Sequence, residues 1–246
     1  MRGPTATADG KSTMWISMDI WGTILDLEAV TEEMAQGLSR LLGKDEGTVE
    51  RTIHAVREKL KRLRRVGAIG AGEMVSRGLE ELGRELEIDV GALRSAVEKV
   101  FEAEVDVSRL VFNDVSEALD ILHARGHRLG VLGNVLLWPG AYTRTLLERA
   151  GLSKYFEFML FADEIGFQKP EREAFIKFCE RAGVAPEDVV HVGDSVAEDV
   201  GGPLSVGMKA VLIDRRGGTL LVLRDFGIAV IHDLRLLPFV ADALIY

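Results

Sequence analysis

Residues 14–23 read Met-Trp-Ile-Ser-Met-Asp-Ile-Trp-Gly-Thr, and this stretch decides the fold of the chain. Its apolar run ends at a single carboxylate, Asp19, and the chain then turns at Gly22-Thr23. In a sheet of parallel strands, ligands bind in the crevice beyond the carboxyl ends of the strands. We therefore predict a buried strand that delivers Asp19 to a site at that edge.

Apolar runs typical of buried strands recur downstream and alternate with helical patterns. The strand-like runs cover residues 128–133, 156–162, 189–193, 209–214 and 227–231. Stripes of apolar residues at helical spacing cover 115–125, 142–150 and 172–181. Strands that alternate with helices favour an α/β fold with a doubly wound parallel sheet.

The stretch between the first strand and residue 105 has a different character. Helical patterns follow one another without a strand, the first with Thr31 as its expected N-cap and the others over 48–66, 73–87 and 90–104. We expect Asp26 to cap or orient the loop that leads into this region. The predicted organisation is a disordered lead-in at 1–13, an α/β core at 14–27 and 105–246, and an α-helical cap at 28–104. Inserted directly after the first strand, the cap is expected to cover the carboxyl edge of the sheet.

Composition excludes several classes of protein. The 246 residues are 47% hydrophobic and carry a net charge of -9, which argues against a nucleic-acid binder because such proteins need a broad basic face. No apolar run approaches the roughly 18 residues of a membrane span, and residues 1–13 lack the apolar centre of a signal peptide. Cys179 is the single cysteine, so no internal disulfide is possible. We expect a cytoplasmic protein, either a monomer or a homodimer.

Four groups of polar residues follow the strand-like runs in a fixed order. They are Asp19, then Gly133-Asn134, then Lys169-Pro170, and last Gly193-Asp194-Ser195 with Asp199. This order resembles the four motifs of the haloacid dehalogenase superfamily, most of whose members are phosphatases. The resemblance covers residues 14–27 and 110–232 and implies a parallel-sheet core with a cap.

The resemblance also implies a mechanism. Asp19 would attack the phosphorus of a small phosphate ester and form an aspartyl phosphate that water hydrolyses. A carboxylate suits this role because it is ionised at neutral pH and needs no base. The implied Mg²⁺ ligands are Asp19, Asp194 and the backbone carbonyl of Trp21, in keeping with the preference of Mg²⁺ for oxygen ligands. Lys169 would neutralise the nucleophile and the transferring oxygens.

The remaining motif residues take supporting roles in this interpretation. Gly133 and Asn134 would bind the phosphoryl group, either through backbone amides or through the Asn134 side chain. Asp199, with Ser195 nearby, would orient the lysine or the waters of the metal.

Two positions depart from the pattern of the family. Trp21 stands where phosphatases usually have a second Asp, which protonates the leaving oxygen and activates water. Because general acid-base help is worth roughly 10²–10⁴-fold, we predict slow turnover of alkyl phosphates and a milder deficit with good leaving groups. Gly133 replaces the usual Ser or Thr. Trp21 could also line the substrate pocket, or serve only in packing.

An aromatic residue at position 21 keeps a second interpretation open. The 2-haloacid dehalogenases of the superfamily carry Tyr there, attack carbon and need no metal. Their fourth motif lacks the Gly-Asp-Ser start, so Asp194 favours a metal-dependent phosphatase. A non-catalytic binding protein on the same scaffold is the third alternative.

Two further features are a histidine in a strand-like run and a cluster of basic residues. His191 lies in an apolar strand and is predicted to be a core histidine that is not a ligand. A basic run lies in one predicted helix of the cap and comprises Arg57, Lys59, Lys61, Arg62, Arg64 and Arg65. It forms either a solvated helix face or a site from which one arginine reaches an anionic tail of the substrate.

Overall fold

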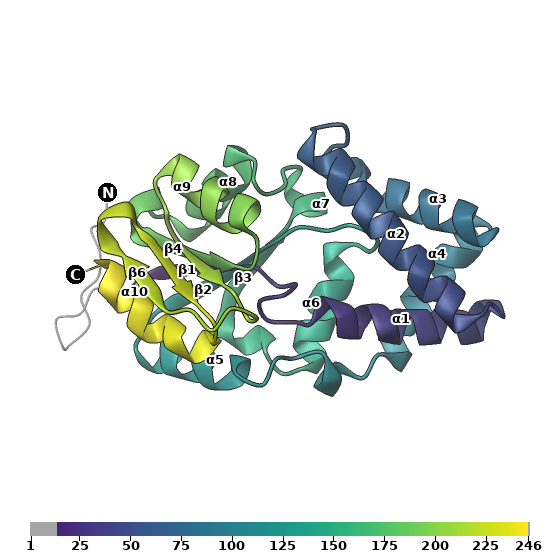
Figure 1. Cartoon of the computed structure of the whole chain (residues 1–246), viewed down its shortest axis with the longest axis horizontal. Helices are drawn as coiled ribbons and strands as arrows, with labels where there is room; N and C mark the ends of the chain where they lie inside the picture. Colours follow the sequence, from purple (N-terminus) through teal and green to yellow (C-terminus); the bar gives the residue numbers. More distant parts are fainter. Residues whose placement is uncertain (1–13, 246) are drawn as a thin grey trace.

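The computed structural model describes residues 14–245, and the predicted lead-in at 1–13 lies outside them. A seven-stranded sheet has the strand order β3-β2-β1-β4-β5-β7-β6 (Figure 1). The strands are β1 (Trp15–Met18), β2 (Arg128–Gly133), β3 (Phe156–Phe161), β4 (Val189–Gly193), β5 (Lys209–Ile213), β6 (Leu221–Leu223) and β7 (Ile228–Ile231). Only the β6–β7 pair among these strands is antiparallel. The prediction of a doubly wound parallel α/β sheet is confirmed.

Strand β1 lies in the interior of the sheet and is covered on both faces. All four of its residues are buried, and it pairs in parallel with β2 on one side and β4 on the other. A strand covered on both faces reads as a continuous apolar run. The pairing of Met18 with Val131 and with Val192 brings the residues that follow β1, β2 and β4 to one edge.

Helices cover both faces of this sheet (Figure 1). Helices α8 (Arg172–Ala182) and α9 (Gly202–Val206) lie on one face, and α5 (Val115–Ala124) and α10 (Leu237–Ile245) lie on the other. Two more helices, α6 (Gly140–Arg149) and α7 (Ala162–Ile165), follow β2 and β3. The predicted elements did not include α7, α10 or the short strand β6. Among residues 14–245, no helix combines the length and the apolar character needed to cross a membrane.

Four helices follow β1 and lie together beyond the carboxyl ends of the strands (Figure 1). They are α1 (Leu27–Leu42), α2 (Glu46–Arg65), α3 (Met74–Leu86) and α4 (Val90–Lys99), with a π-helical turn η2 (Val100–Glu104) after α4. As expected, no strand interrupts this described stretch.

The start of α1 differs from the prediction. Asp26, in an extended conformation, is the N-cap, and its side chain accepts hydrogen bonds from the backbone amides of Glu28 and Ala29. Thr31 lies a turn inside the helix, where its hydroxyl donates to the Leu27 carbonyl. A short acid directly before the helix satisfies its free amide groups better than a threonine inside it.

The chain leaves the sheet and returns to it at neighbouring points. Leu25 forms an antiparallel bridge with Val111, and the Asp26 amide donates to the Leu110 carbonyl at 2.7 Å. The two segments that connect α1–α4 to the sheet therefore run side by side.

Candidate active site

Three carboxylates meet at the carboxyl edge of the sheet. Asp19 follows β1, Asp194 follows β4, and Asp199 lies in the π-helical turn η6 (Val196–Gly201). One carboxylate oxygen from each lies within 4.8 Å of the others. The Asp19 amide donates to the Val192 carbonyl at 2.9 Å, which continues the β1–β4 pairing by one residue and fixes where the Asp19 side chain starts.

Lys169 bridges two of these acids. Its buried ammonium donates to Asp19 Oδ1 at 2.7 Å and to Asp199 Oδ1 at 2.6 Å. Burial alone would lower the pKa of Lys169, but the two carboxylates outweigh it and hold this pKa above its ordinary value. Burial would raise the pKa of Asp199, but the charge of Lys169 and the hydrogen bond with His191 hold this pKa well below its usual range. Lys169 and Asp199 are therefore both charged at neutral pH.

Asp19 and Asp194 carry the opposite perturbation. Burial raises the pKa of Asp19 to about 7, against the opposing effect of Lys169 and with help from the charges of Asp199 and Asp194. The pKa of Asp194 rises to about 6, through desolvation and repulsion by Asp199. Lys169 pairs with Asp19 and Asp199, and its single charge does not balance three carboxylates. A further cation near Asp19 and Asp194 would therefore favour their charged forms.

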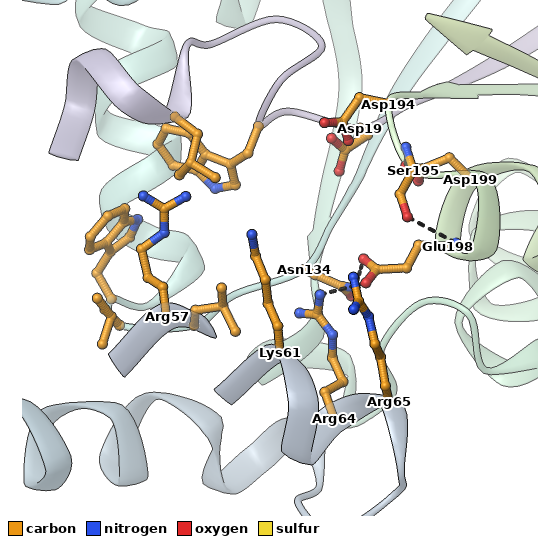
Figure 2. Close-up of a pocket in the computed structure, with 15 residues that line it drawn as sticks. Asp19, Arg57, Lys61, Arg64, Arg65, Asn134, Asp194, Ser195, Glu198 and Asp199 are labelled. Atoms are coloured by element: carbon orange, nitrogen blue, oxygen red, sulfur yellow. Dashed lines mark hydrogen bonds and ion pairs between the residues drawn. The ribbon is translucent and has the colours of Figure 1, made fainter. Parts of the chain in front are cut away.

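A divalent cation fits the residues present. The three carboxylates offer oxygens at close spacing, and Asp194 faces the cavity beside Asp19 (Figure 2). Gly22 has φ +80°, and a Cβ there would overlap the Asp194 carboxylate, so the loop after β1 lies directly against this acid. Hard oxygen donors of this kind suit Mg²⁺.

Asn134 clamps the loop that carries Lys169. Its Oδ1 accepts from the Lys169 amide at 2.8 Å, and its Nδ2 donates to the Lys169 carbonyl and to Glu198 Oε2, both at 2.9 Å. Both donor hydrogens of the side chain are thus engaged. A phosphoryl oxygen near this residue would have to use a backbone amide or displace one of these bonds.

The structure explains the glycine at position 133. A Cβ built on Gly133 would lie 3.0 Å from two atoms of the Phe161 ring, closer than side chains normally pack. The usual Ser or Thr would crowd this ring.

His191 is a buried core histidine, as predicted, but it also belongs to the polar network of the site. Its Nε2 lies 2.9 Å from Asp199 Oδ1 and its Nδ1 lies 2.8 Å from Ser17 Oγ. Burial lowers its pKa to about 4, although the bond to Asp199 acts the other way. The ring is therefore neutral, donates from Nε2 to the carboxylate and accepts from the Ser17 hydroxyl at Nδ1.

Ser195 and Glu198 complete the turn after β4. The Ser195 amide donates to Asp199 Oδ2 at 2.9 Å, and its hydroxyl accepts from the Glu198 amide at 3.4 Å. Glu198 lines the cavity and pairs with Arg64 Nη2 at 2.6 Å. Neither Glu198 nor Ser17 stood out in the sequence. The pairing of Ser17 with His191 is visible only once β1 and β4 are in register.

A cavity of about 290 Å³ lies between the carboxylates and α2 (Figure 2). Its apolar lining consists of Trp21, Leu27, Leu136, Leu137 and Trp138. Trp21 therefore lines the cavity, and it also packs edge-on against Trp138, with 5.7 Å between ring centroids.

Helix α2 divides the basic run between two faces. Arg57, Lys61, Arg64 and Arg65 line the cavity, since positions four or seven residues apart share one helix face. Lys59 instead pairs with Glu81 at 2.7 Å, and Arg62 is exposed. The run is thus not wholly a solvated face, because four of its six cations line the cavity.

Comparison with known proteins identifies relatives of this chain. The family described as haloacid dehalogenase-like hydrolase matches residues 13–207. The phosphoglycolate phosphatase of Nitrosospira multiformis is 30% identical over 185 residues, 74% of each chain. The glyceraldehyde 3-phosphate phosphatase of Methanothermobacter thermautotrophicus is 33% identical over 106 residues, 42% of this chain and 44% of the relative. This chain thus spans less than half the length of that relative.

Solved structures share the fold. The HAD-hydrolase YfnB of Bacillus subtilis superposes with a TM-score of 0.72 at 19% identity, covering 94% of this chain and 99% of the other. A HAD phosphatase of Thermococcus onnurineus gives 0.63 at 26% identity, covering 93% and 98%. A 2-haloacid dehalogenase of Pseudomonas syringae gives 0.65 at 24% identity, covering 94% and 99%.

Proposed function

Because this chain belongs to the haloacid dehalogenase-like hydrolases, we propose that it hydrolyses small phosphate esters through a covalent intermediate on Asp19. The observation that carries the proposal is the arrangement of Lys169 between Asp19 and Asp199, with Asp194 facing the same space. In this proposal Asp19 is the nucleophile, the buried Lys169 is the fixed cation beside it, and Asp194 is the metal-binding acid at the same cavity.

The first chemical step is transfer of the phosphoryl group to the protein. An Asp19 oxygen forms a bond to phosphorus while the bond from phosphorus to the leaving oxygen breaks. Lys169 offsets the charge of Asp19, and Asp199 and Asn134 hold Lys169 in place. Water then attacks the aspartyl phosphate, releases inorganic phosphate and restores the carboxylate.

We further propose that Asp19, Asp194 and the backbone carbonyl of Trp21 hold Mg²⁺. When bound, the ion neutralises the carboxylates and the phosphoryl oxygens, so that an anionic substrate can approach. The environment of Asp19 and Asp194 supports this assignment, because desolvation and the neighbouring carboxylates raise both pKa values, and a bound cation would favour the charged forms.

Trp21 lines the cavity and has no group that titrates, so it cannot protonate the leaving oxygen. We therefore propose that the enzyme favours substrates whose leaving group departs without a proton, such as aryl or acyl phosphates. Substrates with alkyl leaving groups should turn over more slowly by roughly 10²–10⁴-fold, the usual value of general acid catalysis.

We infer that residues 28–104 act as a cap over a core formed by residues 14–27 and 105–246. Two contacts hold the proposed cap against the core. Arg64 of α2 pairs with Glu198 of η6, and the Gln168 side chain donates to the Ile69 carbonyl at 2.9 Å. A cap held in this way excludes water from the site during the reaction.

A metal-independent 2-haloacid dehalogenase is the second candidate, and Trp21 is the residue that favours it. An aromatic side chain and the four other apolar residues of the cavity would suit a halogenated carbon substrate. Asp194 opposes this candidate, since such chemistry has no use for a metal-binding acid beside the nucleophile.

One experiment separates these functions. Phosphate release from an aryl phosphate is measured with Mg²⁺ and with a chelator, for the wild type, Asp19→Asn and Asp194→Asn. Turnover that requires Mg²⁺ and is lost in both variants supports the phosphatase. Release of halide from 2-chloropropionate in the presence of chelator, lost in Asp19→Asn but kept in Asp194→Asn, would replace it with the dehalogenase.

A further inference from the structure

The cavity carries opposite charges at its two ends. Its floor is formed by Asp19, Asp194 and Asp199, and its roof is the α2 face that carries Arg57, Lys61, Arg64 and Arg65 (Figure 2). The proposed phosphoryl site lies on the floor. The rest of a bound substrate therefore extends from the floor towards this basic surface.

The roof cations differ in how fully they are already neutralised. Arg64 pairs with Glu198 at 2.6 Å, and both side chains are largely buried, so this arginine is committed to the contact between α2 and η6. Lys61 Nζ lies 3.1 Å from Glu58 Oε1, but the Glu58 side chain is 57% exposed. A solvent-exposed pair three residues apart on a helix holds a lysine only weakly. Figure 2 shows the Lys61 ammonium directed into the cavity.

Arg57 lies one helical turn before Lys61 and is buried without complete pairing. Its Nη1 donates to Thr31 Oγ1 at 2.7 Å, and its nearest carboxylate, Glu28 Oε1, is 3.5 Å from Nη2 and belongs to a mostly exposed side chain. Its Nε has no hydrogen-bond partner among the described residues. A buried guanidinium in this state is stabilised by any anion that reaches it, because an unpaired buried charge is costly.

Building on the proposed phosphatase function, we propose that Lys61, with Arg57 beside it, binds a second anionic group of the substrate. The preferred substrate is then a small phosphate monoester that also carries a carboxylate. A cavity of about 290 Å³ limits the span between the two groups to a few carbon atoms, because pockets for larger organic ligands start near this volume and extend to roughly 1,000 Å³. The uncharged lining of the cavity is largely apolar, so charge is recognised by the carboxylate cluster and by the cations of α2.

Equilibrium binding tests this assignment without any turnover. Calorimetry in the presence of Mg²⁺ compares phosphonoacetate, which carries a carboxylate, with methylphosphonate, which does not. We expect the wild type to bind phosphonoacetate at least tenfold more tightly, since a charge-assisted hydrogen bond to an anion is worth about this much. Lys61→Met should remove most of that preference, and Lys61→Arg should restore it.

The matched control is Arg62→Met, which removes a cation of the same run that is exposed and does not line the cavity. It should keep the full preference for phosphonoacetate. Equal affinity of the wild type for both phosphonates, binding of neither, or a preference that survives in Lys61→Met would each overturn the assignment. Tighter binding of methylenebisphosphonate than of phosphonoacetate would overturn the choice of a carboxylate.

Turnover of an aryl phosphate decides the proposed function separately. A protein that hydrolyses it with Mg²⁺ but shows no preference between the phosphonates remains a phosphatase without the proposed anion site. A protein that prefers phosphonoacetate through Lys61 but releases no phosphate keeps the anion site and loses the proposed reaction.

Discussion

Arg64 and Glu198 form a 2.6 Å ion pair that joins helix α2 to the turn after β4. The other Glu198 oxygen accepts from Asn134, whose side chain clamps the backbone of Lys169. The position of α2 is thereby linked through three side chains to Lys169, which pairs with Asp19.

This link predicts that loss of Arg64 affects both binding and chemistry. Arg64→Met leaves Glu198 without its cation in a largely buried place, which should loosen the contact between α2 and η6. We expect kcat/KM for an aryl phosphate to fall about tenfold or more, with faster hydrogen exchange in α2. The double variant Arg64→Met/Glu198→Gln should lose less than the sum of the two single changes, because the pair acts as a unit. Strictly additive losses would show that the pair is not coupled.

Magnesium binding should weaken as the pH falls. In the metal-free protein the pKa of Asp19 is raised to about 7 and that of Asp194 to about 6. Both groups therefore take up protons as the pH falls through these values, and Mg²⁺ must displace those protons to bind. Calorimetry between pH 8 and pH 5.5 should show a Kd that rises steadily, by about tenfold per pH unit where one proton is displaced. Asp194→Asn should bind Mg²⁺ more weakly and with a shallower pH dependence. A Kd that does not change with pH would contradict these roles.

Gly133→Ser should destabilise the protein without improving catalysis. The new Cβ would press on Phe161, and crowding of a packed core typically costs about 1–3 kcal/mol. Thermal unfolding should show a lower Tm, and Gly133→Ala should show a similar loss because the clash comes from the Cβ. A serine variant with an unchanged Tm and faster turnover would mean that the position is free to carry the hydroxyl usual in the family.

Trp21→Asp should supply the missing proton donor. We expect turnover of alkyl phosphates to rise more than turnover of aryl phosphates, by up to roughly 10²–10⁴-fold. The substitution also removes a ring that packs on Trp138, so Trp21→Asn serves as a matched control of similar size that cannot carry the proton. Equal rates for Trp21→Asp and Trp21→Asn on alkyl phosphates would show that position 21 does not reach the leaving oxygen.

The strands of the core were predictable because their sequence signals are local. In a run such as Trp15–Met18, three of the four residues are apolar and all are buried, since both faces of an interior parallel strand are covered. The edge strand β6 gave no such signal, because Leu221–Leu223 are only three residues and all are exposed. The start of α1 was misplaced since two residues, Asp26 and Thr31, both had a side chain suited to cap a helix.

The residues of the site could likewise be predicted only where the sequence signal was local. Asp19, Lys169 and Asp194 could be found from motif order alone, and the structure brings them together at one edge. The roles of Glu198, Ser17 and Arg57 depend on contacts between residues 26 to 174 positions apart. No local pattern carries that information, so only the folded chain shows these contacts.

The side-by-side connections at Leu25 and Val111 have a consequence for how specificity can change. Everything from Asp26 to Leu110 forms one loop of chain whose ends are joined by a backbone hydrogen bond. Such an excursion can be lengthened, shortened or exchanged without altering the spacing of the strands that carry Asp19, Lys169 and Asp194. Selection can therefore vary residues 26–110 as one module of the gene, provided that it keeps the Arg64–Glu198 contact through which this module is linked to Lys169.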